Sequence, residues 1–346
     1  MSSQSTKYST LLFCLSYRCN LRCDVCSVGD RLESPDVIGL QEAIRIADEC
    51  HDLGYTRRVG FTGGEPFLQY KNVLAITEHV YGRYGWESNA TTNCTWATTD
   101  RVAQKRLAPL AARGLSWLLI SIDDSHLRQT SESCVHNAIR AARQLGIRCQ
   151  VQTVVTNGSR KADDFRRGLE EFASDDGIEW KDSRCVPMGF AADLPASAMP
   201  LTPGVLMGGC TLFKFIAVLP NGDVGLCCSY FPDELIVGNV RRETVAEILA
   251  RAERNPVCNA VFTWGGPRLI ADLLAEAGHP EYAAASYTNV CHSCHSILSD
   301  RRAVDAVRPL LSELGQELED LKRKAESEWA YLSERQEKLH FWQRSA

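Results

Sequence analysis

Short apolar runs alternate with amphipathic, helix-type stretches over the first half of the chain, and this pattern restricts the fold more than any other feature. The expected strands cover residues 10–15, 57–61, 87–92, 116–121, 147–154 and 178–186, and the expected helices cover residues 40–53, 71–83, 99–113, 131–145 and 161–173. Gly54, Gly114 and Gly146 stand where glycine commonly ends a helix. This alternation predicts an α/β fold of parallel βαβ units, either a partial (β/α)6 barrel or a doubly wound sheet.

Chemistry-bearing residues follow several of these strands. In both arrangements the functional side chains gather where parallel strands end. The residues at these ends are Cys19 to Cys26, Gly63 to Glu65, Asn93, Ser121, Asn157 and Val186 to Gly189. We therefore expect one site, built from several loops, at this edge of the sheet.

Cys19, Cys23 and Cys26 form a C-x3-C-x2-C motif in the loop after the first strand. Three thiolates can hold three irons of a 4Fe–4S cluster and leave the fourth iron without a protein ligand. Such an open position can bind a substrate or a cofactor. Zinc is the alternative, but a zinc knuckle needs a fourth ligand close by, and the next candidates are Cys50 and His51.

This motif resembles that of the radical S-adenosylmethionine (radical SAM) enzymes. The resemblance implies a TIM-like partial barrel, a 4Fe–4S cluster on the three cysteines, and SAM chelated by the open iron. It also implies reductive cleavage of SAM to a 5′-deoxyadenosyl radical that abstracts a substrate hydrogen. The run Phe61-Thr62-Gly63-Gly64-Glu65-Pro66 supports it. In the family a Gly-Gly-Glu run at this place binds the SAM amino group, which implies that role for Gly63, Gly64 and Glu65.

Three more residues are expected to contact the cofactor, namely Asn93, Ser121 and Asp123. The family often places Ser and a second polar residue after the fourth strand to contact SAM. A strand-to-helix cap is the alternative role of Ser121 and Asp123. Val25 departs from the family pattern, in which the residue before the third cysteine is usually aromatic and stacks near the adenine.

A second set of cysteines lies in the last third of the chain. Cys210 and Cys227 flank two apolar runs that are joined by Asn221-Gly222, which is a strong hairpin signal. Cys291 and Cys294 form a C-x2-C pair downstream. Four thiolates are enough for a closed metal site, and a zinc ribbon would use the same set.

The second set resembles the twitch module, the shortened form of the SPASM extension of radical SAM enzymes. Gly222-x4-Cys227 fits its Gly-x4-Cys pattern, and no cysteine follows Cys294. The resemblance implies one auxiliary 4Fe–4S cluster on Cys210, Cys227, Cys291 and Cys294. Cys228 is the alternative to Cys227 as a ligand.

Cys185 and His126 are the candidate catalytic residues. A thiol after the sixth strand, such as Cys185, could donate a hydrogen atom to a substrate radical, as in radical SAM epimerases; a packed thiol is the alternative. His126 could act as a base near its ordinary pKa, and an exposed loop histidine is the alternative. Cys14, Cys50 and Cys149 lie on apolar faces and are predicted to be buried thiols.

Composition excludes several classes of function. The 346 residues carry a net charge of −5, so a nucleic-acid partner is not expected. No apolar run reaches the length of a membrane span, and the N-terminus lacks the apolar core of a signal peptide. We therefore expect a cytoplasmic protein, whose 15 cysteines are metal ligands and buried thiols.

The last segment has helical periodicity. Leu311, Leu314, Leu318, Leu321 and Ala325 recur at a spacing of three or four over residues 303–343, and Trp329, Leu332 and Leu339 follow less regularly. The pattern predicts a long amphipathic helix that packs against its own barrel or forms a homodimer through a short coiled coil. The expected domains are a barrel over 8–200, an auxiliary-cluster module over 201–300 and this helix over 301–346.

The resemblance implies cofactor chemistry more than a substrate. A fully ligated auxiliary cluster suits a net oxidation, which favours oxidative tailoring of a natural product: dehydrogenation, cross-linking or epimerisation of a peptide, a sugar or an aminocyclitol. The first strand begins by about Ser9, so no leader-binding domain is expected in front of it. Flavodoxin or ferredoxin would donate electrons. A scaffold that binds zinc or an iron–sulfur cluster without catalysis is the alternative.

Overall fold

A mostly parallel sheet forms the centre of the molecule. The computed structural model describes residues 8, 10–169, 177–204, 210, 215–228 and 232–345, with side chains up to residue 329. The strands of the first half are β1 (Thr10–Cys14), β2 (Arg58–Thr62), β3 (Glu87–Thr92), β4 (Leu115–Ser121), β5 (Arg148–Val155) and β6 (Ile178–Arg184). They are neighbours in chain order, and each pair is parallel. A doubly wound sheet would change direction at a switch point, so this order confirms the partial barrel.

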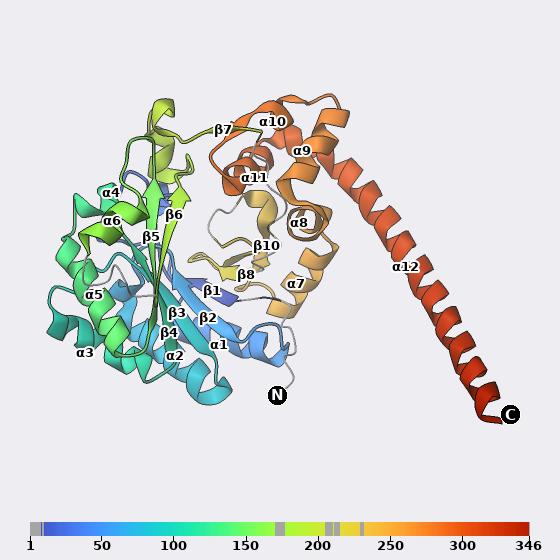
Figure 1. Cartoon of the computed structure of the whole chain (residues 1–346), viewed down its shortest axis with the longest axis horizontal. Coiled ribbons are helices and arrows are strands. Elements are labelled where there is room, and N and C mark those ends of the chain that lie inside the picture. Colours follow the sequence, from blue (N-terminus) through green and yellow to red (C-terminus); the bar gives the residue numbers. More distant parts are fainter. Residues whose placement is uncertain are drawn as a thin grey trace.

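Helices cover the outer side of these strands (Figure 1). They are α1 (Leu40–Asp52), α2 (Tyr70–Tyr84), α3 (Asp100–Ala111), α4 (Asp124–Leu127), α5 (Glu132–Gln144) and α6 (Ala162–Gly168). Large side chains such as Phe13, Phe61 and Leu118 are fully buried between the two layers. The glycines that follow three of the helices, Gly54, Gly114 and Gly146, have positive φ angles, as the sequence predicts.

The expected element bounds agree with the observed ones within about two residues wherever the structure describes them. Residues 170–173 of the helix expected over 161–173 lie outside the described residues. So do Phe213 and Lys214, which precede the observed strand β8 (Phe215–Val218).

The C-terminal segment continues the barrel sheet. Strand β8 pairs in parallel with β1, with Thr10 opposite Phe215 and Phe13 opposite Val218. Strands β9 (Asp223–Gly225) and β10 (Ile236–Asn239) follow as antiparallel neighbours. The turn between β8 and β9 contains Gly222 with φ 88°, as the expected hairpin requires. The first cysteine loop and the hairpin of the second cysteine set therefore stand on adjacent strands.

Helices surround this hairpin. They are α7 (Val245–Arg254), α8 (Pro256–Asn259), α9 (Gly266–Glu276), α10 (Glu281–Ala284) and α11 (Val290–Leu298), and a short ladder joins β7 (Thr202–Pro203) to β11 (Ser286–Tyr287). None of the helices in the described part is long and apolar enough to cross a membrane.

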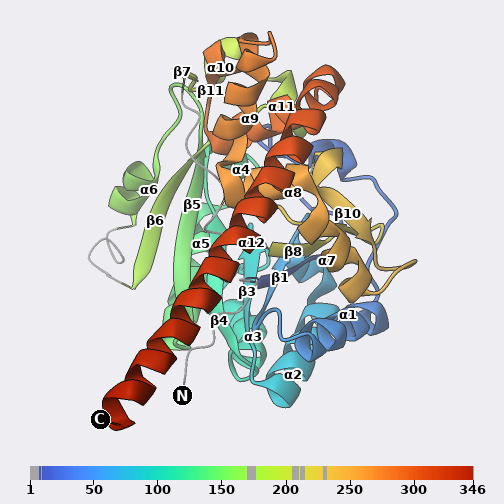
Figure 2. The ribbon, with the colours of Figure 1, turned by 90° about the vertical axis from the view of Figure 1, so that its right-hand side faces the viewer.

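Helix α12 (Arg301–Ser345) has an anchored part and a projecting part. Ala303, Val304, Val307 and Leu311 are buried, and the helix packs there on α8, α9 and α11. Beyond these turns it leaves the body of the molecule (Figures 1 and 2). The expectation that the apolar stripe packs on the barrel is therefore wrong, because the anchoring helices belong to the C-terminal segment. The side chains of Leu332 and Leu339 lie outside the described residues.

Candidate functional site

Cys19, Cys23 and Cys26 share the loop that follows β1. The backbone N–H of Cys26 donates to the carbonyl of Cys23 at 3.0 Å, which closes a tight turn between the last two thiols. Burial raises the pKa of the Cys26 thiol to about 11, and the charges of Cys23 and Cys19 add to this effect. Three thiols in one short loop, two of them half-buried and Cys23 buried, are the donor set of an iron–sulfur cluster.

Cys19 receives hydrogen bonds to its sulfur from two donors. Its Sγ lies 3.4 Å from the backbone N–H of Leu21 and 3.7 Å from Nδ2 of Asn93, at the end of β3. Asn93 is therefore brought to the cysteine loop and contacts a ligand sulfur in the protein itself. Hydrogen bonds to cluster sulfurs are one of the means by which a protein sets the potential of the cluster.

Gly63 and Gly64 pack closely against the chain segment that leads into the cysteine loop. A Cβ atom on Gly63 would lie 2.4 Å from Cys14 Sγ, and one on Gly64 would lie 2.0 Å from the carbonyl oxygen of Arg18. The N–H of Gly64 donates to Ser16 O, and that of Glu65 donates to Arg18 O. Glycine at these two positions thus permits a close approach of two backbone segments. The sequence alone does not reveal this requirement.

The Glu65 carboxylate is occupied by groups of the chain. Oε1 accepts from the N–H of Phe67 at 3.0 Å and from the Thr92 hydroxyl at 2.9 Å, and Oε2 accepts from the N–H of Asn93 at 2.8 Å. Burial raises its pKa to about 7 although these three hydrogen bonds oppose the shift. Glu65 therefore joins the end of β2 to the end of β3, with little carboxylate surface left for a ligand.

Asp123 caps helix α4, as the alternative interpretation of this residue proposes. Oδ1 accepts from the N–H groups of Ser125 and His126 at 2.9 Å. Ser121 is the last residue of β4 and is half-buried. The second oxygen of Asp123, Oδ2, contacts His126.

His126 is not an exposed loop residue. Its side chain is 15% exposed, and Nδ1 lies 2.9 Å from Asp123 Oδ2. Burial disfavours the charged ring, but the contacts with Asp123 and Cys23 outweigh this and raise the pKa of His126 to about 10. Asp123 Oδ2 and His126 Nδ1 are therefore paired with each other, beside Cys23.

Cys185 lies just after β6 and is buried. It packs with Ala191 and Met199, and Val25 of the cysteine loop borders the same cluster. Burial raises the pKa of its thiol to about 11, with a contribution from the charge of Asp123. Cys185 thus lies near the first site, with its side chain packed among apolar residues.

Helix α4 and the residues after it hold the cysteine loop, which sequence reasoning missed. The Ser125 hydroxyl accepts from the N–H of Asp24 at 2.7 Å. The Gln129 side chain both accepts from the N–H of Arg22 and donates to its carbonyl, each at 2.8 Å. These residues are more than 100 positions apart in the chain, so no local pattern announces their contact.

The second cysteine set lines one hollow. Cys210, Cys227, Cys291 and Cys294 all border it, as the hairpin and the C-x2-C pair predict. Asn289 caps helix α11 by accepting from the N–H of His292, and Cys291 and Cys294 follow one turn apart. Burial and the other three cysteines raise the pKa of the Cys294 thiol. The donor set fits a four-thiolate cluster.

Cys228 lies beside this hollow without lining it. A contact with Cys227, together with burial, raises the pKa of the Cys228 thiol. Cys227 borders the hollow itself and Cys228 does not, which favours Cys227 as the ligand. Among the described residues, no group of three or more Cys, His, Asp or Glu side chains converges on a single metal ion.

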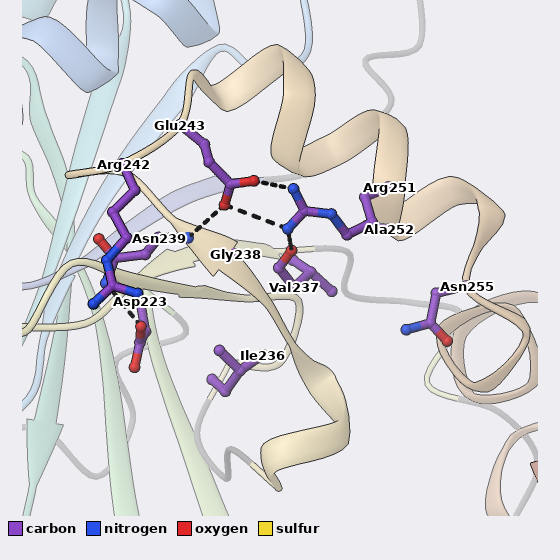
Figure 3. A pocket seen from close by; sticks show the side chains of 10 residues that line it. All are labelled: Asp223, Ile236, Val237, Gly238, Asn239, Arg242, Glu243, Arg251, Ala252 and Asn255. Atoms are coloured by element: carbon purple, nitrogen blue, oxygen red, sulfur yellow. Dashed lines mark hydrogen bonds and ion pairs between the residues drawn. The ribbon is translucent and has the colours of Figure 1, made fainter.

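A separate polar hollow lies behind strand β10 (Figure 3). Its polar groups satisfy one another: Glu243 pairs with Arg251 and accepts from the N–H of Asn239 at 3.3 Å, and Arg251 donates to the carbonyl of Val237 at 3.0 Å. These contacts join strand β10 to helix α7, and the residues that border the hollow include none of the cysteines.

Two family models match the chain in the places where the cysteine sets lie. The Radical SAM superfamily matches residues 13–164, and SPASM, an iron–sulfur cluster-binding domain, matches residues 210–295.

Two curated relatives share part of the sequence. A GTP 3′,8-cyclase of Paracoccus denitrificans (strain Pd 1222) is 25% identical over 178 residues, which are 50% of this chain and 51% of that protein. A GTP 3′,8-cyclase of Paenarthrobacter nicotinovorans is 30% identical over 115 residues, 32% of this chain and 31% of that protein. The chain thus spans about half the length of the first relative and less of the second.

Solved structures agree over most of the fold. Native anSMEcpe with bound AdoMet has a TM-score of 0.51 and 15% identity, and the match covers 89% of this chain and 99% of that one. The same protein with AdoMet and a Cp18Cys peptide also has a TM-score of 0.51 and 15% identity, covering 90% and 99%. At this identity the likeness concerns the fold.

Proposed function

The chain is a member of the radical SAM superfamily with a C-terminal SPASM-like iron–sulfur module, and we propose that it carries out a two-electron oxidation of a natural product. The two domains bind 4Fe–4S clusters and SAM. When bound, the first cluster supplies the electron that cleaves SAM, and the resulting 5′-deoxyadenosyl radical removes a hydrogen atom from the substrate.

One observation carries the oxidative assignment: the strand before the first cysteine set pairs with the hairpin that two cysteines of the second set flank. The first follows β1, and the second flanks the hairpin whose strand β8 pairs with β1. Loss of a hydrogen atom, then of one electron and one proton, completes a two-electron oxidation. The second electron needs an acceptor, and a cluster on four thiolates, with no open iron for substrate, suits that task.

Within the first site the chain's own residues have separate roles. Cys19, Cys23 and Cys26 hold the cluster, and Asn93 donates to the sulfur of Cys19. Gly63, Gly64 and Glu65 fix the loop that carries these cysteines. The paired side chains of Asp123 and His126 lie beside Cys23, and Ser121 ends the strand that leads to them; we assign all three to the cofactor side of the site.

The charges around the first site favour a neutral or cationic substrate over a triphosphate. Arg22 pairs with Glu33, Arg128 with Asp24, and Arg160 with Asp124. Each carboxylate offsets the charge of its arginine, which weakens the local attraction for a triphosphate. We therefore place peptides, sugars and aminocyclitols ahead of GTP, which the similarity to GTP 3′,8-cyclases keeps as the second candidate.

The test is a measurement of 5′-deoxyadenosine and product mass from anaerobically reconstituted, reduced protein. It is offered a peptide panel, a sugar and aminocyclitol panel, and GTP in separate reactions. Stimulation by one of the first two panels, with a product two mass units lighter, is the expected result. Stimulation by GTP alone, or a product of unchanged oxidation state, would contradict the proposal.

Further partners follow from the same proposal. Reduction of the first cluster requires an electron donor such as flavodoxin or ferredoxin, which we place in the cytoplasm with the enzyme. The exposed stripe of α12, including Leu318 and Leu321, would join two copies in a homodimer. The base role of His126 remains a proposal, and the hydrogen-atom donor role of Cys185 belongs to epimerisation, the redox-neutral alternative to the oxidation proposed above.

A further inference from the structure

The hollow of the auxiliary site is almost entirely apolar apart from its thiols. The residues that line it, besides the four cysteines, are Pro232, Leu235, Val261, Phe262, Pro267, Val290 and His295. Among the described residues of this lining, His295 is thus the one side chain that carries a strong hydrogen-bond donor. In apolar surroundings a single hydrogen bond has a larger electrostatic effect than it has in water.

His295 lies on helix α11 with Cys291 and Cys294, and all three border the same hollow. It follows Cys291 by four residues and Cys294 by one, so it shares the helix face of Cys291. Its ring is half-buried. A histidine at this position shares the surroundings of the cluster instead of extending into solvent.

One ring nitrogen of His295 already has a partner. Nε2 lies 3.2 Å from the hydroxyl of Ser299, one turn further along the helix. When the hydroxyl donates to Nε2, the proton of the neutral ring sits on Nδ1. The ring is then held in one tautomer by Ser299 and keeps an N–H for a second acceptor.

His292, on the same helix, is arranged differently. Its Nδ1 accepts from the N–H of Thr288 at 3.0 Å, and its ring meets Tyr287 edge-on. It does not line the hollow. The two histidines of the Cys-His-Ser-Cys-His run therefore have different surroundings. His292 contacts β11 and the residue after it, whereas His295 borders the thiols.

We propose that His295 donates an N–H hydrogen bond to a sulfur of the auxiliary cluster and thereby raises the reduction potential of that cluster. The reduced cluster carries one more negative charge, so a donor to its sulfur stabilises the reduced form more than the oxidised form. A higher potential fits the role of electron acceptor. This inference rests on the proposed auxiliary cluster and assigns a tuning residue to it.

The test is an EPR-monitored redox titration of the full chain with both clusters in place. His295→Leu removes the donor at similar size, and His295→Gln keeps an N–H donor. We expect the auxiliary midpoint potential to fall in the Leu variant, to stay close to wild type in the Gln variant, and to be unchanged in the control His292→Gln. The barrel cluster of each sample serves as the internal reference.

Iron content separates the possible failures. Each 4Fe–4S cluster contributes about four irons per chain, and all variants should keep both clusters. An unshifted auxiliary potential in the Leu variant would overturn the proposal. Loss of one cluster in the Leu variant would identify His295 as a ligand or a structural support and would overturn it as well. A wild-type chain with about four irons would instead refute the auxiliary cluster itself.

Discussion

At the residue scale, the packing of Gly64 links backbone geometry to cluster binding. Its missing side chain lets the loop after β2 approach the carbonyl of Arg18, next to the first ligand Cys19. This backbone contact cannot be relieved by a side-chain rotation, so an added methyl group must displace the cysteine loop.

We therefore expect Gly64→Ala to lose the barrel cluster, about half of the bound iron, while the auxiliary cluster remains. The matched control is Gly82→Ala in helix α2, where an added Cβ meets nothing within 4 Å. Alanine there should be neutral or stabilise by up to about 1 kcal/mol. Iron analysis and thermal unfolding measure both variants, and full iron content in Gly64→Ala would disprove this account of the loop.

Glu65 provides a pH-dependent prediction at the same scale. Its pKa is raised to about 7, so the folded chain holds its proton over a range in which an unfolded Glu, with a pKa of about 4.3, has lost it. The free energy of unfolding therefore decreases as the pH rises from about 4.3 to about 7, by roughly 2–3 kcal/mol from this group. Burial of the charge is the cause.

The Glu65→Gln variant cannot titrate at this position. The difference in unfolding free energy between wild type and variant should therefore fall between pH 5 and pH 7.5, as measured by anaerobic urea unfolding at several pH values. A constant difference across this range would show that Glu65 titrates as an exposed carboxylate does. The Gln amide also faces the N–H of Asn93, so a pH-independent loss of about 1–3 kcal/mol is expected besides.

At the element scale, helix α12 is buried over its first turns and exposed beyond them. Leu311 is fully buried, whereas Leu321 is 62% exposed and Trp329 is 73% exposed. A long helix whose apolar stripe stays in water gains little stability from packing, and a partner helix would cover the stripe.

If α12 joins two copies, wild-type protein sediments as a dimer and Leu321→Lys shifts it toward the monomer without changing its thermal stability in the monomeric state. Glu326→Lys adds the same positive side chain away from the stripe and should leave the dimer intact. Sedimentation equilibrium of the full chain checks all three. A monomeric wild type at micromolar concentration would refute the proposed homodimer.

The elements of the barrel were accessible from sequence, and the pairing of β8 was not. Strand bounds follow from local alternation and from glycines such as Gly54 and Gly146, which end helices within a few residues of the pattern that they terminate. The parallel contact of β8 with β1 joins residues about 200 positions apart. Only the packing of the whole chain decides it.

The same limit explains what was missed in the site. The spacing of Cys19, Cys23 and Cys26 identifies a cluster loop because ligand chemistry requires it. Glu65 accepts a hydrogen bond from Thr92, and Ser125 and Gln129 bond the backbone of the cysteine loop. These contacts join loops that are distant in the chain, so no local pattern encodes them. His295 lies beside a motif cysteine, yet only the apolar lining of the hollow distinguishes it from His292.

At the scale of the whole molecule, one continuous sheet joins the loop of the first cysteine set to the hairpin of the second, while Cys291 and Cys294 lie on helix α11. Strand β1 leads into the loop of the first set, and its neighbour β8 belongs to the hairpin of the second. Burial lowers the pKa of His295 in the second site, and the charge of Arg31 in the first loop region adds to this effect. The pairing of β1 with β8 thus joins the two regions of the chain.

We assign SAM cleavage to the first cysteine set alone. This assignment is tested by measuring 5′-deoxyadenosine, by mass spectrometry, from reduced and anaerobically reconstituted wild type, Cys23→Ala and Cys210→Ala. We expect 5′-deoxyadenosine from wild type, none from Cys23→Ala, and an intact barrel cluster that still cleaves SAM in Cys210→Ala. Formation of 5′-deoxyadenosine by the Cys23 variant, or none by an iron-loaded wild type, would refute the assignment.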